Sequence, residues 1–479
     1  MKKKKIFIFY FIITIIFFGM LIKLEFATDT YAVFNFNKEE VFMQYAMSGR
    51  FITGIIFKFF KLINVPEIIM YELSFAFAVF CATLSQYILY KIIEKVVKSK
   101  LLKILIPTLI IINPFSIELF LFIEKGIMWF GILMCILATN QTIRFFETKL
   151  KKHIIFALIF MFLANCSYQG VVGIFLSISL VFILKYSKNI KQFVVNNFIV
   201  GIIYAIPALL DLVLVKILYK ASRINGQVVL LDSMKLIIQN TQNMYLKMYD
   251  LLPKYVFILL ILFTFVVFCC KILKDNKRFS NVLSFFYIII GITFVAIAPQ
   301  IVQPTHLIWF SPRSTYSFAS MYGILILYLA MNYEVGYIIK NLILLISFLL
   351  IIFQVQKFIT IEKDRYILNK NDKEIAMQII EQIEKYEKQT GNIINKISWY
   401  QDEKANYSYN GIFVTSDMNV KCYSSDWSTV EILKYYLKRN IKLEKKDKKL
   451  EEFFKSKNWN EFNIEQILFD KNKLNLCNY

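Results

Sequence analysis

Long apolar runs separated by short polar segments fill the first three quarters of the chain. A helix needs roughly 20 apolar residues to cross a bilayer core about 30 Å thick. Runs that approach this length lie at 6–23, 68–90, 101–115, 126–143, 154–167, 170–184, 194–218, 255–272, 281–299, 317–332 and 337–356. The pattern predicts a mainly α, polytopic bundle of about eleven transmembrane helices over residues 1–356.

The pattern changes after residue 356, and residues 357–479 are predicted to form a small soluble α/β domain. Isoleucines at helical spacing mark a helix over Lys363–Thr390. Two short β-rich runs predict strands at Ile397–Tyr400 and Gly411–Thr415, and Asp426 or Ser428 could cap a helix that runs to about Tyr436.

Basic residues between the runs predict the orientation of the bundle. Five short segments (1–5, 91–103, 144–153, 185–191 and 271–278) contain 20 Lys/Arg in 43 residues. The loops on the opposite side of the bundle contain only 11 Lys/Arg in 109 residues. The positive-inside rule then puts the N-terminus in the cytoplasm, and eleven spans put the C-terminal domain outside. If the two spans on either side of Asn332–Gly336 formed a single span, the C-terminal domain would lie on the cytoplasmic side instead. We interpret residues 1–23 as an uncleaved span, because no A-x-A cleavage site follows them.

Composition excludes several classes of protein. Hydrophobic residues make up 57 % of the chain, above the 45–50 % or so of soluble domains, so an ordinary soluble enzyme and a disordered chain are both excluded. The net charge of +22 could suggest a nucleic-acid partner. The cations cluster at the ends of apolar runs, however, so we predict a lipid bilayer as the partner and no nucleic acid.

The cysteines and histidines do not predict a metal site. Five of the seven cysteines lie in or beside predicted spans, where Cys behaves as a small apolar residue. Cys422 and Cys477 lie in the outer domain, where a disulfide is one alternative. Only two histidines are present, without a CxxC, HExxH or DxD motif. The sequence therefore predicts no particular cofactor and no dedicated metal centre. A divalent cation bound loosely at a substrate phosphate is the open alternative.

The predicted first outer loop, residues 24–67, contains the candidate chemistry. It carries Asp29, then Glu39 and Glu40, and then Ser48-Gly49-Arg50. A carboxylate near a guanidinium at the membrane surface suits sugar transfer from a lipid-linked phosphate, because the acceptor hydroxyl needs a base and the leaving phosphate needs cationic donors. The alternative for Asp29 is a helix-capping or loop carboxylate. Residues 51–63 are predicted to form an amphipathic helix, either at the headgroups or packed on the bundle.

Arginine is rare enough to be informative. The chain has seven Arg beside 49 Lys, and those on the predicted outer side before the tail are Arg50, Arg223 and Arg313. A planar guanidinium can bind phosphate with two parallel hydrogen bonds, which an ammonium cannot. Interfacial anchoring beside Trp309 is the alternative for Arg313. Asp211 lies within a predicted span, where charge is costly and often functional.

Several short motifs occur in an order that resembles the GtrII-like glucosyltransferase family. They are Asp29-Thr30-Tyr31, Ser48-Gly49-Arg50, Asn113-Pro114-Phe115, Ser167-Tyr168-Gln169, Pro312-Arg313 and Ser424-Ser425-Asp426-Trp427. The resemblance implies a GT-C-like membrane glycosyltransferase that takes a hexose, with glucose as the expected sugar, from a polyprenyl-phosphate donor. The acceptor it implies is an envelope polysaccharide on the outer face.

The resemblance and the chemistry of the residues together predict roles for single residues. Catalytic carboxylates of GT-C enzymes lie in the first outer loop, which indicates Asp29. Members often carry an acid directly before Gly-Arg, where this chain has Ser48, so Glu39 and Glu40 are the alternatives. Arg50 and Arg313 would bind the phosphate, with Arg223 as a lesser candidate. Tyr168 and Gln169 would line the acceptor path or form a plain helical-hairpin turn.

Two other classes stay open at this point. A flippase or transporter of lipid-linked sugars would need pseudo-symmetric halves and charges deep in facing spans, and the sequence has no such repeat. A glycan polymerase or ligase would use similar charges on the same side of the membrane.

Overall fold

The computed structural model describes residues 3–22, 26–219, 230–248, 251–274, 278–301, 308, 310–331, 337–401, 421–457, 459 and 462–478. It is mostly helical, with a small C-terminal sheet, which confirms the predicted fold class. The chain divides into two compact units. Unit 1 comprises residues 1–22, 38–120 and 124–358, and unit 2 comprises residues 23–37, 121–123 and 359–479.

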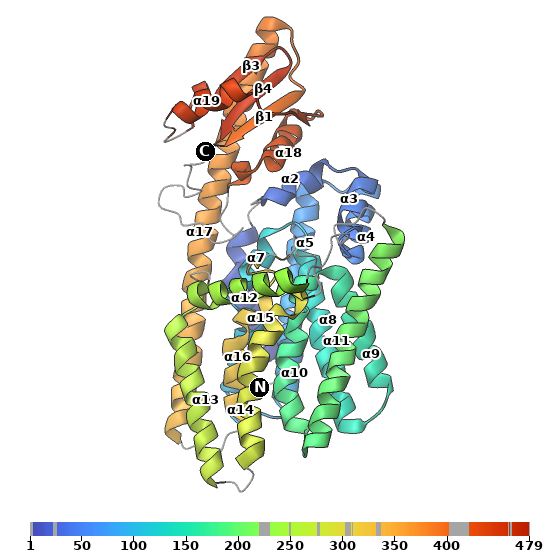
Figure 1. The fold of residues 1–479 in the computed structure, drawn as a ribbon, viewed down its shortest axis with the longest axis vertical. Helices are drawn as coiled ribbons and strands as arrows, with labels where there is room; N and C mark the ends of the chain where they lie inside the picture. The colour runs from blue at the N-terminus through green and yellow to red at the C-terminus, as the bar shows by residue number, and fades with distance from the viewer. Residues whose placement is uncertain are drawn as a thin grey trace. The chain divides into compact units, whose positions relative to one another are not determined.

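Unit 1 is a helical bundle (Figure 1). Its long apolar elements are α1 (Lys3–Phe18), α5 (Glu67–Ile93), α6 (Leu102–Ile111), α8 (Lys125–Thr148), α9 (Lys152–Ser167), α10 (Gly173–Tyr186), α11 (Ile190–Leu218), α13 (Lys254–Lys274), α14 (Arg278–Ile297), α16 (Met321–Met331) and the first part of α17 (Tyr337–Thr390). Among the described residues, seven helices are long and apolar enough to cross a membrane, and four shorter apolar helices accompany them. These helices lie where the apolar runs predicted spans. The loop at Asn332–Gly336 lies outside the described residues.

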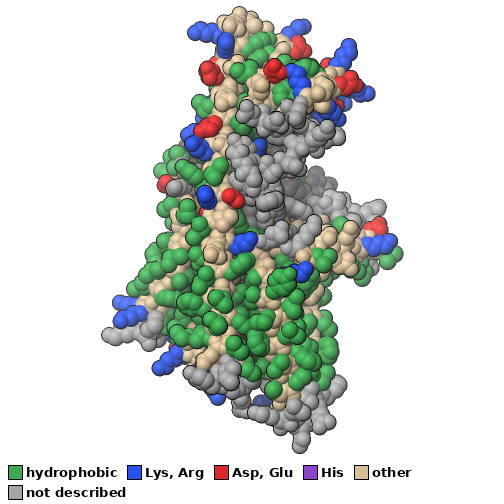
Figure 2. Space-filling view, turned by 90° about the vertical axis from the view of Figure 1, so that its left-hand side faces the viewer, with side chains coloured by type: hydrophobic (Ala, Val, Ile, Leu, Met, Phe, Trp, Pro, Cys, Tyr) green, Lys and Arg blue, Asp and Glu red, His purple; other side chains and the backbone are tan. Residues whose placement is uncertain are grey.

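The outer surface of the bundle is suited to lipid. On the face shown in Figure 2, apolar side chains form a broad and almost continuous band over unit 1. The first part of α17 contributes exposed Leu345, Phe348, Leu349 and Ile352 to the surface. Exposed apolar area on this scale is unfavourable in water and favourable in a bilayer. The chain is therefore a membrane protein.

The remaining α-helices of unit 1 lie between these apolar elements in the sequence. They are α3 (Lys38–Ala46), α4 (Phe51–Leu62), α7 (Ser116–Leu121), α12 (Leu230–Lys247) and α15 (Tyr316–Ala319). The helix expected over 51–63 is present as α4. One face packs inward through Thr53, Gly54 and Phe57, while Ile55 and Phe59 stay exposed. α4 therefore packs on the bundle and also presents an exposed apolar face, while its position at the headgroups stays a prediction.

Unit 2 is an α/β domain built on a four-stranded sheet of order β2-β1-β4-β3. The strands are β1 (Lys396–Gln401), β2 (Lys442–Leu443), β3 (Ile467–Asp470) and β4 (Lys473–Asn478). β1 pairs in parallel with β2 and β4, and β3 pairs antiparallel with β4. Its helices are α2 (Thr28–Asn35), α18 (Asp426–Leu437), α19 (Lys448–Ser456) and the end of α17. The strand expected at Gly411–Thr415 lies outside the described residues.

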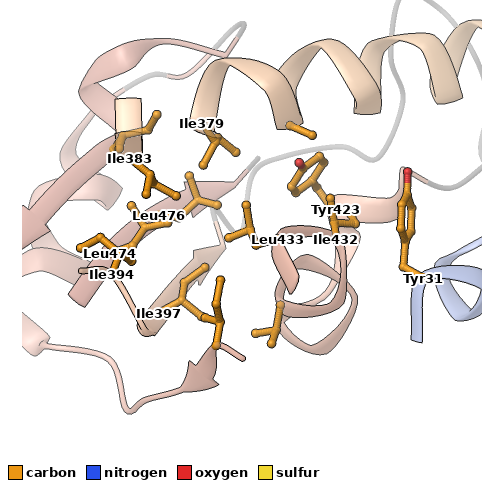
Figure 3. Close-up of a cluster of buried hydrophobic side chains, with 14 of the residues drawn as sticks. Tyr31, Ile379, Ile383, Ile394, Ile397, Tyr423, Ile432, Leu433, Leu474 and Leu476 are labelled. Carbon is orange, nitrogen blue, oxygen red and sulfur yellow. The ribbon is translucent and has the colours of Figure 1, made fainter. Parts of the chain in front are cut away.

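Alternate residues of the sheet form two cores. Ile397 pairs with Leu474 on one face, and both are buried against α17 and α18 (Figure 3). Tyr400 pairs with Cys477 on the other face, where Phe454 of α19 covers them. Cys422 lies in the first core, so Cys422 and Cys477 belong to different clusters, and both are free thiols.

Residues 26–35 are part of the first core of unit 2. Tyr31 of α2 is buried in it beside Tyr423, and Leu433 belongs to the same core (Figure 3). Asn35 Nδ2 donates to the Glu431 carbonyl oxygen at 2.7 Å and to Glu431 Oε2 at 2.8 Å. The helix that carries Asp29 is therefore held by the C-terminal domain.

Candidate active site

Asn113 and Pro114 end α6 and allow a charged segment to enter the protein interior. Asn113 Oδ1 accepts the Phe115 N–H at 3.0 Å, and its Nδ2 donates to Ser320 Oγ at 3.0 Å. Pro114 cannot continue the helical hydrogen bonding. The chain turns into α7, which places Glu118 in a fully buried position, and Glu124 is also buried just before α8.

Arg50 lies at the end of a tight turn between α3 and α4. Gly49 has φ +78°, a left-handed conformation that favours glycine, and the Arg50 N–H donates to the Tyr45 carbonyl at 3.0 Å. Gln169 Nε2 donates to the Ser48 carbonyl at 3.0 Å. The backbone before Arg50 is therefore held from both sides.

The Arg50 guanidinium lies over an aromatic ring and beside a carboxylate. Its Cζ is 4.6 Å from the centroid of the buried Tyr168 ring, and Nη1 is 3.9 Å from Glu124 Oε1. The Arg50 side chain keeps 29 % of its surface exposed. Cation–π contact with Tyr168 orients the guanidinium and leaves some of its N–H donors accessible.

Arg313 approaches the same tyrosine from the segment before α15. Its backbone N–H donates to Glu118 Oε2 at 2.5 Å. A Cβ placed on Gly170 would be 2.8 Å from the Arg313 carbonyl oxygen, so this segment touches the turn after Tyr168. Burial raises the pKa of the Tyr168 phenol, the charges of Arg313 and Arg50 lower it, and those of Glu118 and Glu124 raise it.

Arg50, Glu118, Glu124, Tyr168 and Arg313 together form what we call the Tyr168 cluster. It lies at the end of unit 1 where α6 and α9 end and α8 begins. Two guanidinium groups supply charge-assisted donors for an anion such as phosphate, and the glutamates balance their charge in its absence.

The family comparison identifies the class of protein. The model of the glucosyl transferase GtrII family matches residues 17–330, well over half of the chain and including the whole Tyr168 cluster. This chain belongs to the GtrII glucosyltransferase family. The GtrII family resemblance that the motifs indicated is thus confirmed. Comparisons with curated proteins and with solved structures gave no match.

The other predicted site residues of this GtrII glucosyltransferase are not members of the Tyr168 cluster. Asp29 is half-buried in the first turn of α2, within unit 2. Glu39 pairs with Lys58 at 2.8 Å on an exposed surface, and Glu40 is exposed in the first turn of α3. Arg223 lies outside the described residues.

Sequence reasoning did not single out Glu118, Glu124 or Lys125. Lys125 is fully buried, with Nζ 3.5 Å from the centroid of the Tyr71 ring. The sequence does contain a feature that could have identified them, because these three charges interrupt an otherwise apolar stretch over 115–132. Among the described residues, no group of three or more His, Cys, Asp or Glu could hold a metal ion.

Replacing Gly49 with Ala should weaken the turn that carries Arg50. The new Cβ would lie 2.5 Å from Asp211 Oδ2 and 2.6 Å from Gln169 Nε2. The left-handed backbone would also cost an L-residue about 1–2 kcal/mol of conformational energy in the folded state. We expect a lower melting temperature in detergent. The control is Gly201→Ala in α11, where a Cβ meets nothing within 4 Å. Equal melting temperatures for the two variants would contradict the prediction.

Proposed function

We propose that this GtrII glucosyltransferase transfers a hexose, most simply glucose, from polyprenyl phosphate to an envelope polysaccharide on the outer face of the membrane. The acceptor hydroxyl oxygen attacks the anomeric carbon, and the bond from that carbon to the phosphate oxygen breaks. Polyprenyl phosphate leaves, and the configuration at the anomeric carbon inverts.

The observation that carries the proposal is the pair of arginines at Tyr168. The polyprenyl-phosphate leaving group develops negative charge as the sugar departs, and guanidinium donors are suited to stabilise it. The Tyr168 cluster lies at the opposite end of the bundle from Lys3–Lys5, which the positive-inside rule puts in the cytoplasm. This supports an outer-face reaction.

We assign roles to the residues as follows. Asp29 takes the proton of the acceptor hydroxyl, with Glu39 and Glu40 as the alternative carboxylates. Arg50 and Arg313 bind the donor phosphate, and Arg223 assists. Tyr168 supports Arg50, Gln169 holds the turn before it, and the exposed apolar face of α4 borders the lipid chain.

Transfer in proteoliposomes tests the proposal. Purified protein receives labelled polyprenyl-phosphate glucose and envelope glycan, and glycan-bound label is counted. We expect transfer that depends on the protein and an inverted linkage by NMR. Movement of labelled lipid between leaflets without transfer would refute the proposal and favour a flippase.

Arg313→Lys should weaken donor binding while keeping the charge. An ammonium cannot form the two parallel hydrogen bonds of a guanidinium, so we expect the KM for the donor to rise about tenfold or more. Steady-state kinetics with varied donor measure this. An unchanged KM would show that Arg313 only anchors its segment.

A further inference from the structure

We propose that Asp211 is a positioning residue for donor binding, which acts on Arg50 through Gln169. The inference rests on the proposed role of Arg50 and extends the site to a membrane-spanning helix. Asp211 lies in α11, among the exposed apolar residues Leu209, Leu210 and Val213, yet is itself only 4 % exposed. A buried carboxylate in such a helix is costly unless it makes specific hydrogen bonds.

The Asp211 carboxylate makes such bonds with the segment around Tyr168. Oδ2 accepts a hydrogen bond from Gln169 Nε2 at 3.0 Å. Oδ1 lies 3.9 Å from the Cys166 thiol, which is a weak donor. Cys166 and Gln169 lie on either side of Tyr168, so Asp211 fixes both ends of the short segment that supports Arg50.

Gln169 connects Asp211 to the Arg50 turn. The Nε2 group has two hydrogens, and it donates to both Asp211 Oδ2 and the Ser48 carbonyl. The geometry is tight, because Gly49 leaves no room for a Cβ between Asp211 and Gln169. A change at Asp211 therefore releases Gln169 and, with it, the backbone two residues before Arg50.

Two consecutive residues thus hold Arg50 by different means. Tyr168 orients the guanidinium through its ring, and Gln169 orients the main chain through Ser48. Asp211 contributes through Gln169, and its two carboxylate oxygens face protein groups. We assign Asp211 to positioning rather than to contact with the sugar or phosphate.

A double-mutant cycle tests the inference. Binding of polyprenyl phosphate to detergent-solubilised full-length protein is measured for wild type, Asp211→Leu, Arg50→Ala and the double variant. We expect Asp211→Leu to raise the Kd about tenfold in the wild-type background and to have no further effect in the Arg50→Ala background. Asp211→Asn keeps an acceptor for Gln169 and should lie between wild type and Asp211→Leu.

Asn196→Leu is the matched control. Asn196 is a buried polar residue of the same helix, and its Nδ2 donates to Ser187 Oγ at 3.0 Å, remote in sequence from the Arg50 contacts. It should lower the melting temperature without changing polyprenyl-phosphate affinity. An unchanged Kd for Asp211→Leu, or losses that add in the double variant, would overturn the inference.

The outcomes separate this inference from the proposed function. If wild type binds polyprenyl phosphate with the expected coupling but transfers no sugar, the positioning role stands and the proposed reaction fails. If wild type transfers sugar and Asp211→Leu binds the donor normally, the reaction stands and the positioning role fails.

Discussion

Replacing Asp29 with Asn should abolish sugar transfer, with kcat lower by about 10²–10⁴-fold. The amide has nearly the same shape as the carboxylate but cannot accept the proton of the acceptor hydroxyl. Donor binding is assigned to Arg50 and Arg313, so the donor affinity should stay unchanged. Initial rates in proteoliposomes at saturating donor and acceptor measure kcat, and polyprenyl-phosphate binding measures affinity.

Matched controls for Asp29→Asn are available in the next helix. Glu39→Gln and Glu40→Gln also neutralise a carboxylate in the first turn of a helix, and each removes a favourable helix-dipole interaction of about 0.3–1 kcal/mol, as Asp29→Asn does. Loss of kcat in Asp29→Asn alone would support Asp29 as the base. Full activity in Asp29→Asn, with loss in one glutamate variant, would transfer the role to that glutamate.

Apolar run length was sufficient to predict the apolar helices of unit 1, because burial in a bilayer dominates their energetics, but it did not predict α3, α7 or α12. The turn around Asn165–Gly170 also appears where polar residues interrupt the pattern, with α9 ending at Ser167 and α10 beginning at Gly173. Arg50 and Arg313 were selected by their chemistry, and the structure brings both to Tyr168.

Tertiary contacts account for what the sequence did not predict. The turn between β3 and β4 is Lys471-Asn472, with Lys471 at φ +50°, and it lacks the Asn-Gly or Asp-Gly signal of a tight hairpin. Residues 23–37 follow the first span closely in the sequence, but they belong to unit 2, because the buried Tyr31 completes a core whose other members begin at Ala376. No local pattern encodes such a long-range match.

Loss of the Arg365 side chain should destabilise the packing of α2 within unit 2. It is 1 % exposed in the second part of α17, and its Nη2 donates to the Phe26 carbonyl oxygen. Asn369, one turn later, accepts the Phe26 N–H through Oδ1 at 2.5 Å. Both polar groups of the Phe26 backbone are thus held by one face of α17, directly before the helix that carries Asp29.

Arg365→Met should therefore release α2 from unit 2. The substitution keeps the apolar stem but leaves a buried carbonyl without its charged donor, at a cost of about 1.5–3 kcal/mol. We expect faster amide hydrogen exchange in residues 26–35 and a lower kcat, with unchanged polyprenyl-phosphate affinity. Arg439→Met is the control, because Arg439 pairs with Glu387 at a more exposed site of the same unit, where an ion pair contributes about 1 kcal/mol or less. Equal exchange in residues 26–35 of the two variants would show that Arg365 does not hold α2, and kcat would then have no reason to fall.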